Sequence, residues 1–178
     1  KNFQFLFFGR IISEKGIIDL VEAIKIINKK ISNISFLLIG DTDENDKKYK
    51  QISQYINNSS GLFTYKKHSD NIAKYIKNSD CVILPSHREG MPRSLLEAAS
   101  YGVPIIASDV PGCNDIIINK KTGLLFKAKD PSDIVDKLIY FINMTHKEKI
   151  ILSKNARNKI EKEFDESIVI KSYNKYIN

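Results

Sequence analysis

Two glutamates, Glu89 and Glu97, stand eight positions apart in the segment 85–98, which reads PSHREGMPRSLLEA. Residues 80–84 before it, DCVIL, are apolar after the first position and typical of a buried strand. A strand, then a loop that carries an acid, then a helix start is where α/β proteins bind nucleotides. Free backbone N–H groups suit a phosphate there, and carboxylates suit sugar hydroxyls. The alternative is an ordinary strand-to-helix loop with two solvated glutamates, since the spacing alone is only suggestive.

The positions of Pro92 and Gly102 indicate how a helix would present Glu97. Proline suits the first helical position, and glycine suits a left-handed stop, so we expect the helix to run over 92–101. Glu97 then lies about 7.5 Å along the axis from Pro92, at roughly 1.5 Å per residue. Helical side chains lean toward the N-terminus, so its carboxylate can reach the helix mouth. Glu89, in the loop, would lie above the same mouth.

A pair of cations flanks an earlier turn between a strand and a helix. Residues 5–10 read FLFFGR, and apolar residues from Ile17 onward keep a period near 3.6. Arg10 and Lys15 lie between these two elements. Such a pair can neutralise a diphosphate at the carboxyl edge of a parallel sheet, because Arg supplies a planar fork and Lys a mobile charge. The alternative is two solvated surface cations in a lysine-rich chain.

These motifs together resemble a known enzyme family. The wording EGMPRSLLEA at 89–98, followed by GVPIIASDVPG at 102–112, resembles the signature of two glutamates separated by seven residues in family 4 retaining glycosyltransferases, which have the GT-B fold. The resemblance extends from Phe5 to Ile142, with the cation motif in the matching place. It implies that the chain is the C-terminal, donor-binding half of a two-domain enzyme, without its N-terminal acceptor domain, and that this half alone is inactive.

The resemblance also implies a role for each motif residue. Arg10 and Lys15 would contact the donor diphosphate, and Glu97 the ribose hydroxyls. Glu89 would orient the transferred sugar together with the backbone N–H groups near Gly90 and Met91, and Ser94 would add a phosphate contact. Because cations stabilise the departing diphosphate, neither a metal nor another cofactor is expected. The sugar would pass with retained configuration to a glycan or lipid-linked acceptor in cell-surface polysaccharide synthesis.

The segment 61–70, GLFTYKKHSD, departs from the family pattern. The resemblance places Tyr65 and His68 along the nucleotide base, but the usual glycine-bearing turn is missing there. The base therefore stays open, with UDP preferred over GDP and ADP. A lone loop histidine is also often a solvated surface residue.

Two other functions stay open. A nucleotide-sugar epimerase of the same architecture would need an acid and a base, for which His68 and His87 are the histidine candidates. A non-catalytic nucleotide-binding module is the other alternative, against which the intact cations and glutamates argue.

Composition sets the class of protein. The 178 residues fit one domain, and 42% hydrophobic with 28% charged residues is ordinary for a globular chain. Cys81 and Cys113 show neither metal-ligand spacing nor a disulfide framework, and no apolar run approaches a membrane span, so we expect a cytoplasmic protein. The net charge of +7 comes from dispersed lysines, which favours a basic surface over nucleic-acid binding. The resemblance, through its lipid-linked acceptors, implies peripheral contact with the inner face of the plasma membrane.

The elements that must position these residues alternate along the chain. Six strands, each followed by a helix, predict an α/β, Rossmann-like doubly wound parallel sheet with helices on both faces. Right-handed crossovers would then bring Arg10, Lys15, the 65–68 loop and Glu89 to one edge. The strands are expected at 3–9, 35–40, 62–65, 80–84, 104–107 and 123–126, and the helices at 14–30, 44–57, 70–78, 92–101, 114–118 and 131–143.

A helical tail is expected to close the chain. Thr145 and Glu148 match a capping box, which predicts a helix start, and a break follows near Phe164. The last segment, 168–177, carries isoleucines and tyrosines that would form an apolar face. This face would pack on the sheet of this domain or on the partner domain.

Overall fold

The computed structural model describes residues 2–59 and 61–165 and contains a six-stranded sheet in the order β3-β2-β1-β4-β5-β6. All neighbouring strands pair in parallel, which confirms the predicted doubly wound sheet. The order reverses between β1 and β4, where ligands bind in such folds. The strands are β1 (Phe3–Phe8), β2 (Ile34–Ile39), β3 (Thr64–Lys66), β4 (Cys81–Leu84), β5 (Ile105–Ser108) and β6 (Leu124–Phe126).

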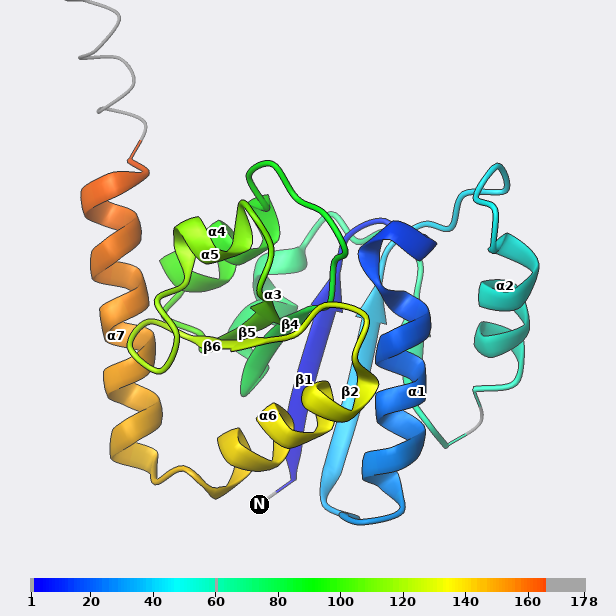
Figure 1. The fold of residues 1–178 in the computed structure, drawn as a ribbon, viewed down its shortest axis with the longest axis horizontal. Coiled ribbons are helices and arrows are strands. Elements are labelled where there is room, and N and C mark those ends of the chain that lie inside the picture. The colour runs from blue at the N-terminus through cyan, green and yellow to red at the C-terminus, as the bar shows by residue number, and fades with distance from the viewer. Residues whose placement is uncertain (1, 60, 166–178) are drawn as a thin grey trace, which may run out of the picture.

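Helices cover both faces of the sheet (Figure 1). α1 and α6 pack together on one face, α4 packs on β4 and β5 on the other, and α7 packs on α4 and α5. The helices are α1 (Ile17–Asn28), α2 (Tyr49–Asn57), α3 (Ile72–Lys77), α4 (Arg93–Ser100), α5 (Cys113–Ile116), α6 (Pro131–Asn143) and α7 (His146–Glu163), and a 3-10 turn, η1, spans Ser13–Lys15.

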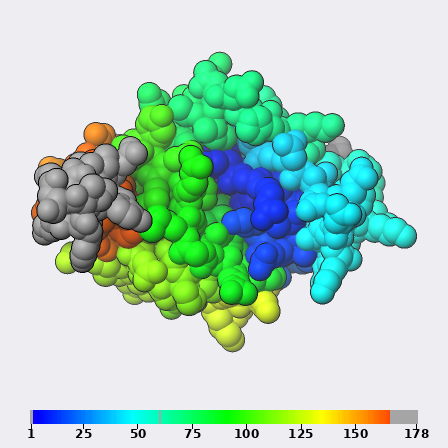
Figure 2. Space-filling model, turned by 90° about the horizontal axis from the view of Figure 1, so that it is seen from above, coloured from blue at the N-terminus to red at the C-terminus, as the bar shows by residue number. Residues whose placement is uncertain are grey.

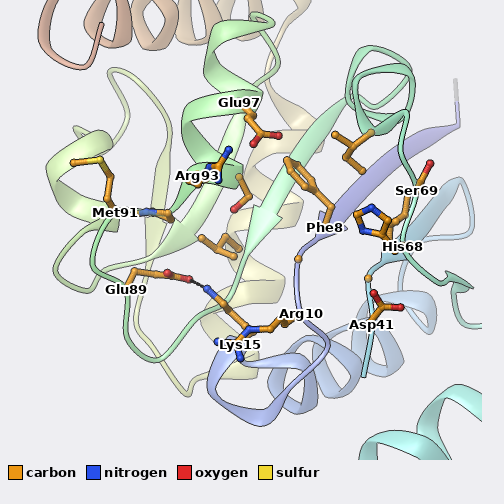
Figure 3. Close-up of a pocket in the computed structure, with 17 residues that line it drawn as sticks. Phe8, Arg10, Lys15, Asp41, His68, Ser69, Glu89, Met91, Arg93 and Glu97 are labelled. Carbon is orange, nitrogen blue, oxygen red and sulfur yellow. Dashed lines mark hydrogen bonds and ion pairs between the residues drawn. The ribbon is translucent and has the colours of Figure 1, made fainter. Parts of the chain in front are cut away.

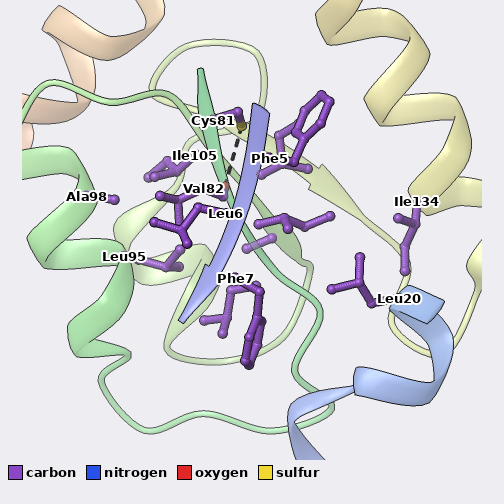
Figure 4. Packing of buried hydrophobic residues seen from close by; sticks show 14 of the residues in the cluster. Phe5, Leu6, Phe7, Leu20, Cys81, Val82, Leu95, Ala98, Ile105 and Ile134 are labelled. Atoms are coloured by element: carbon purple, nitrogen blue, oxygen red, sulfur yellow. Dashed lines mark hydrogen bonds between the residues drawn. The ribbon is translucent and has the colours of Figure 1, made fainter. Parts of the chain in front are cut away.

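The core lies on both sides of the central strands. Residues 5–8 of β1 and 81–84 of β4 are all buried, as expected for parallel strands with both faces covered. Figure 4 shows Leu95 and Ala98 of α4 on one side of the strands and Leu20 and Ile134, from α1 and α6, on the other. Two layers of apolar side chains therefore fix the sheet that presents the loops.

Both cysteines are free and buried. Burial, with a smaller contribution from the charge of Glu89, raises the pKa of the Cys113 thiol to about 12. A thiol with that pKa stays protonated near neutral pH and is a poor nucleophile.

Two expected helices begin later than the sequence predicted. The helix expected at 14–30 is interrupted at Gly16, whose φ of 68° ends η1 before α1 begins. The helix expected at 44–57 begins only at Tyr49. Before it, the carboxylates of Asp43 and Asp46 accept the N–H groups of Asn45 and Lys48. Such local side-chain bonds offer the backbone an alternative to the helix, which explains the shorter element.

The helix that carries Glu97 begins one residue later than expected. Pro92 has an extended ψ of 99° and precedes the helix, so its predicted place as the first helical residue is wrong. Its carbonyl instead accepts the N–H groups of Leu95 and Leu96 and so starts α4. The left-handed stop at Gly102 is confirmed by its φ of 67°.

The caps near the end of the chain follow the prediction. The side chain of Asp130 accepts the N–H of Asp133, and Thr145 and Glu148 form the expected capping box. α7 ends at Glu163, beside the predicted break. The segment 168–177 lies outside the described residues.

Candidate active site

A cavity of about 550 Å³ opens at the carboxyl edge of the sheet. Figure 2 looks down on this edge. The residues that follow β1, in blue, lie between the segment that follows β4, in green, and the segment that follows β2, in cyan. The predicted residues that line the cavity come from four separate segments. They are Arg10, Lys15, His68, Glu89, Met91, Ser94 and Glu97. Because β1 and β4 are neighbours in the sheet, the loops after them face each other here.

Two predicted site residues do not line this cavity. Tyr65 turns its hydroxyl toward β2 and donates to the Gly40 carbonyl at 3.0 Å. Burial, and then the charge of Asp41, raises the pKa of the Tyr65 hydroxyl, so it remains a donor. The Gly90 carbonyl lies beside Gly112, where an added Cβ would be only 2.4 Å away. Both residues therefore contact neighbouring backbone outside the cavity.

Lys15 and Glu89 join the two sides of the cavity. The Lys15 Nζ donates to the Glu89 Oε1 at 2.5 Å (Figure 3). The Ser86 hydroxyl donates to the same oxygen at 2.6 Å. The side chain of Glu89 is only 8% exposed, so these two bonds replace most of the hydrogen bonds that water would otherwise make to it. The sequence predicted that Lys15 and Glu89 would meet at one edge of the sheet, and the structure shows a direct bond between them.

Arg10 and Arg93 also line the cavity, and both are exposed. Within residues 2–59 and 61–165, neither guanidinium forms a hydrogen bond or an ion pair. Each can therefore meet an anion without first losing a partner. Together with Lys15, they give the cavity three cationic side chains.

Glu97 is the fifth residue of α4 and lines the cavity. This agrees with the prediction that its side chain leans toward the N-terminus of the helix. Figure 3 shows it on the far side of the cavity from Arg10 and Lys15. Arg93 and Ser94, the first two residues of α4, line the same space. The N-terminus of α4 thus offers backbone N–H groups at the cavity, an arrangement that suits phosphate.

The two histidines proposed as acid or base differ in position. His68 lines the cavity, with its side chain 71% exposed and its Nε2 3.4 Å from Asp70 Oδ1. His87 does not line it; its Nε2 lies 2.5 Å from Asp19 Oδ2 on α1. No second histidine among the described residues therefore stands with His68 in the cavity.

Sequence reasoning missed several lining residues. Asp41 and Arg93 are the charged ones, and Figure 3 shows Asp41 beside His68. Asp41 stands two residues after the end of β2, so the rule that polar residues after strands gather at one edge could have found it. Arg93 stands inside the glutamate motif itself. The missed apolar residues of the lining include Phe8, Ile39, Ile72 and Leu84, which only the packed fold brings together.

Comparison with known proteins agrees with the motif. A family model described as glycosyl transferases group 1 matches residues 1–159. The capsular polysaccharide biosynthesis glycosyltransferase CapM of Staphylococcus aureus is 30% identical over 168 residues, which covers 94% of this chain and 44% of the relative. The Escherichia coli UDP-Gal:alpha-D-GlcNAc-diphosphoundecaprenol alpha-1,3-galactosyltransferase is 34% identical, with 92% and 42% covered. The chain thus spans less than half the length of these curated relatives.

Solved structures show the same fold. Anabaena HepE, in complex with UDP and glucose, superposes with a TM-score of 0.88 over 99% of this chain and 48% of that one, at 19% identity. The C-terminal domain of LpcC, a glycosyl transferase group 1 family protein from Francisella tularensis, gives 0.79 over 92% and 87%, at 24% identity. The fold expected from the motifs is confirmed. No helix in the described part of the chain has the length and apolar character needed to cross a membrane.

Proposed function

Because the chain belongs to the group 1 family of glycosyltransferases, we propose that it binds the sugar-nucleotide donor of a retaining transferase. One observation carries the proposal: a single cavity brings three cations together with Glu89 and Glu97 at the point where the strand order reverses. Cations suit the diphosphate, and carboxylates suit ribose and sugar hydroxyls. This chemistry matches a nucleotide-diphosphate sugar.

In the proposed mode the diphosphate lies between Arg10, Lys15 and the start of α4. The guanidinium of Arg10 offers a planar fork to two phosphate oxygens, and Lys15 adds a mobile charge. Negative charge grows on the diphosphate as the sugar leaves, so cations already placed beside it stabilise the transition state more than the ground state. The N–H groups of α4 and the hydroxyl of Ser94 add to the same effect. The reaction then proceeds without a metal ion.

Glu97 and Glu89 bind different hydroxyls of the donor. Glu97, in the second turn of α4, accepts from the ribose. Glu89, whose Oε1 already has two donors, offers its second carboxylate oxygen to the transferred sugar. Met91 and His68 line the same cavity. In this mode the backbone near Met91 binds the transferred sugar, and His68 lies beside the nucleotide base. In this mode neither glutamate transfers a proton.

Relatives support the donor and acceptor classes that we propose. Anabaena HepE was solved in complex with UDP and glucose, and the Escherichia coli relative is named for UDP-Gal and a diphosphoundecaprenol acceptor. We propose UDP as the nucleotide and a glycan or lipid-linked acceptor, used at the cytoplasmic side of a membrane. A second domain would supply the acceptor site, because the chain covers 44% of CapM. The donor domain alone would then bind but not transfer.

A nucleotide panel tests this proposal. UDP, GDP, ADP, UDP-glucose, UDP-galactose and UDP-N-acetylglucosamine would be compared in thermal unfolding, with and without EDTA. At a hundred times the Kd, a ligand adds about 2.7 kcal/mol, which is roughly 5–10 °C for a chain of this size. UDP and at least one UDP-sugar should give such a shift, unchanged by EDTA. A panel without any shift would exclude the donor-site assignment.

A further inference from the structure

The loop between β4 and α4 is tied to the η1–α1 region through His87. The His87 backbone N–H donates to the Glu14 carbonyl at 2.9 Å, and its side-chain Nε2 lies 2.5 Å from Asp19 Oδ2. Because a carboxylate only accepts hydrogen bonds, the Nε2 of His87 carries the proton in this contact. The two side chains are 26% and 19% exposed, so water competes only partly with the bond. One residue therefore anchors the loop to both η1 and α1.

Glu89 lies two residues farther along the same loop. Its Oε1 accepts from Lys15, which belongs to η1, and from Ser86, the neighbour of His87. Ser86 is fully buried, and its carbonyl accepts from the hydroxyl of Ser108. The loop and η1 thus meet twice, once at the cavity through Lys15 and Glu89 and once behind it through His87. Both contacts therefore join the same loop to the η1–α1 region.

The backbones at this junction are also in close contact. A Cβ on Gly16 would lie 1.9 Å from the Pro85 carbonyl oxygen. Asp19 stands one helical turn after Gly16, in the first turn of α1. The pair therefore fastens two segments that already touch, so the loop has little room to move while the bond exists.

We propose that the Asp19–His87 pair is a positioning device that holds Glu89 and Lys15 in register across the donor cavity. This inference rests on the proposed function for its ligand but not for its geometry. His87 does not touch the donor and acts through the loop, so it is a positioning residue. This role replaces the acid or base role considered for His87 from the sequence.

Binding measurements on His87→Ala test the role. In the proposed mode UDP-glucose reaches Lys15 and Glu89, whereas UMP lacks both the second phosphate and the sugar. We expect the affinity for UDP-glucose in calorimetry to fall about ten-fold, the effect of losing one hydrogen bond to a charged group, and the affinity for UMP to change less than about two-fold. His87→Gln should recover most of the loss, because its amide N–H can still reach Asp19. An equal loss for both ligands, or no loss, would overturn the proposal.

A double-mutant cycle separates positioning from general loosening. If His87 acts through Glu89, then adding His87→Ala to Glu89→Ala should cause less than about a two-fold further loss of UDP-glucose affinity. A full ten-fold further loss would show an independent effect and contradict the inference. His146→Ala is the matched control, since His146 is exposed at the start of α7.

A ligand-free measurement keeps this inference separate from the proposed function. Backbone amide exchange of residues 86–90 should be faster in His87→Ala than in the wild type and close to wild type in His87→Gln and His146→Ala. If the wild type binds neither UMP nor UDP-glucose, the proposed function fails while exchange still reports on the loop. Unchanged exchange in His87→Ala would reject the positioning role whatever the nucleotides do.

Discussion

Arg10 and Lys15 occupy the same cavity but differ in their partners. Lys15 is bonded to Glu89, whereas Arg10 has no ion-pair partner within the described residues. A diphosphate that binds Lys15 must share it with Glu89, while binding to Arg10 breaks no existing bond. At the scale of single residues, Arg10 should therefore supply affinity, and the Lys15–Glu89 pair should supply discrimination between UDP and a UDP-sugar.

The Arg10→Ala variant should bind UDP about 10–100-fold more weakly in calorimetry, because hydrogen bonds to charged groups contribute about 1.5–3 kcal/mol. Arg88→Ala is the matched control, since Arg88 is exposed on the neighbouring loop and does not line the cavity. It should change the affinity less than about two-fold. Equal affinities in Arg10→Ala and the wild type would refute the diphosphate contact.

The Glu89→Gln variant should separate the two ligands. Removing one negative charge releases Lys15 toward phosphate, so UDP should bind about 1.5–5-fold more tightly, the range of a partly exposed ion pair. UDP-glucose should bind more weakly because the sugar loses its carboxylate acceptor. Calorimetric titrations of UDP and of UDP-glucose, each into the wild type and the variant, measure the two opposite changes in affinity. Weaker binding of UDP and UDP-glucose alike would show that Glu89 supports the whole cavity instead of the sugar.

At the scale of elements, short connections determine where the cavity residues lie. Gly16 ends η1 and starts α1, and Pro92 starts α4 just before the residues that line the cavity. α7 packs on α4, and its own start is set by a capping box. Changes at these few positions should act on stability first and on binding through it.

The Gly16→Ala variant should destabilise more than Gly102→Ala. Both glycines have a φ near 67°, but an added Cβ meets the Pro85 carbonyl only at Gly16. The shared φ should cost about 1 kcal/mol in each variant, and the overlap should add about 1–3 kcal/mol at Gly16 alone. Urea unfolding measures both free energies. Equal losses would mean that the close approach to Pro85 relaxes without cost.

The Thr145→Ala variant should lower the free energy of unfolding by about 1 kcal/mol, since it removes the cap of α7. The hydroxyl of Thr145 accepts the Glu148 N–H, and that residue's carboxylate accepts from Thr145 in return. Ser153→Ala, at a half-buried position inside α7 where the hydroxyl bonds to the Ile150 carbonyl of the same helix, is the control and should change stability by less than about 0.5 kcal/mol. A fully stable Thr145→Ala would show that packing on α4 starts this helix without the cap.

At the scale of the whole molecule, several carboxylates connect segments outside the cavity. Burial opposes ionisation of Asp46, but the N–H of Lys48 and the hydroxyl and N–H of Ser13 outweigh it, so its pKa is lowered. Asp133 behaves alike: burial opposes ionisation, and Lys137 and the Lys127 N–H still lower its pKa. Each carboxylate is therefore more acidic in the folded chain than in the unfolded one.

Stability should consequently decline in acid. A carboxylate with a lowered folded pKa contributes stability that is complete above its unfolded pKa of about 4 and is lost as pH falls through the folded pKa. The urea midpoint should be flat from pH 7 to about pH 5 and should fall below that. Asp46→Asn should have a lower midpoint at pH 7 and a shallower acid decline than the wild type. A midpoint independent of pH down to about pH 3 would contradict these pKa shifts.

The sequence alone determined the type of fold and most of the charged groups of the candidate site. Strongly apolar runs at β1, β2, β4 and β5, each followed by a helical pattern, leave a parallel sheet as the consistent arrangement. The spacing of Glu89 and Glu97 around a helix start placed both at one edge, because strand and helix periods are local properties. The comparisons confirm the family that these motifs resemble.

Only the tertiary structure decided which of these groups touch. The Lys15–Glu89 and Asp19–His87 contacts join residues 74 and 68 positions apart, and no local pattern predicts such pairs. The same holds for Asp41 and Arg93 in the lining and for Tyr65, which turns toward Gly40. Local periodicity fixes the direction of each side chain within its own element. The distance between elements depends on how closely their backbones pack, and at Gly16 and Pro85 that packing is set by the absence of a single Cβ.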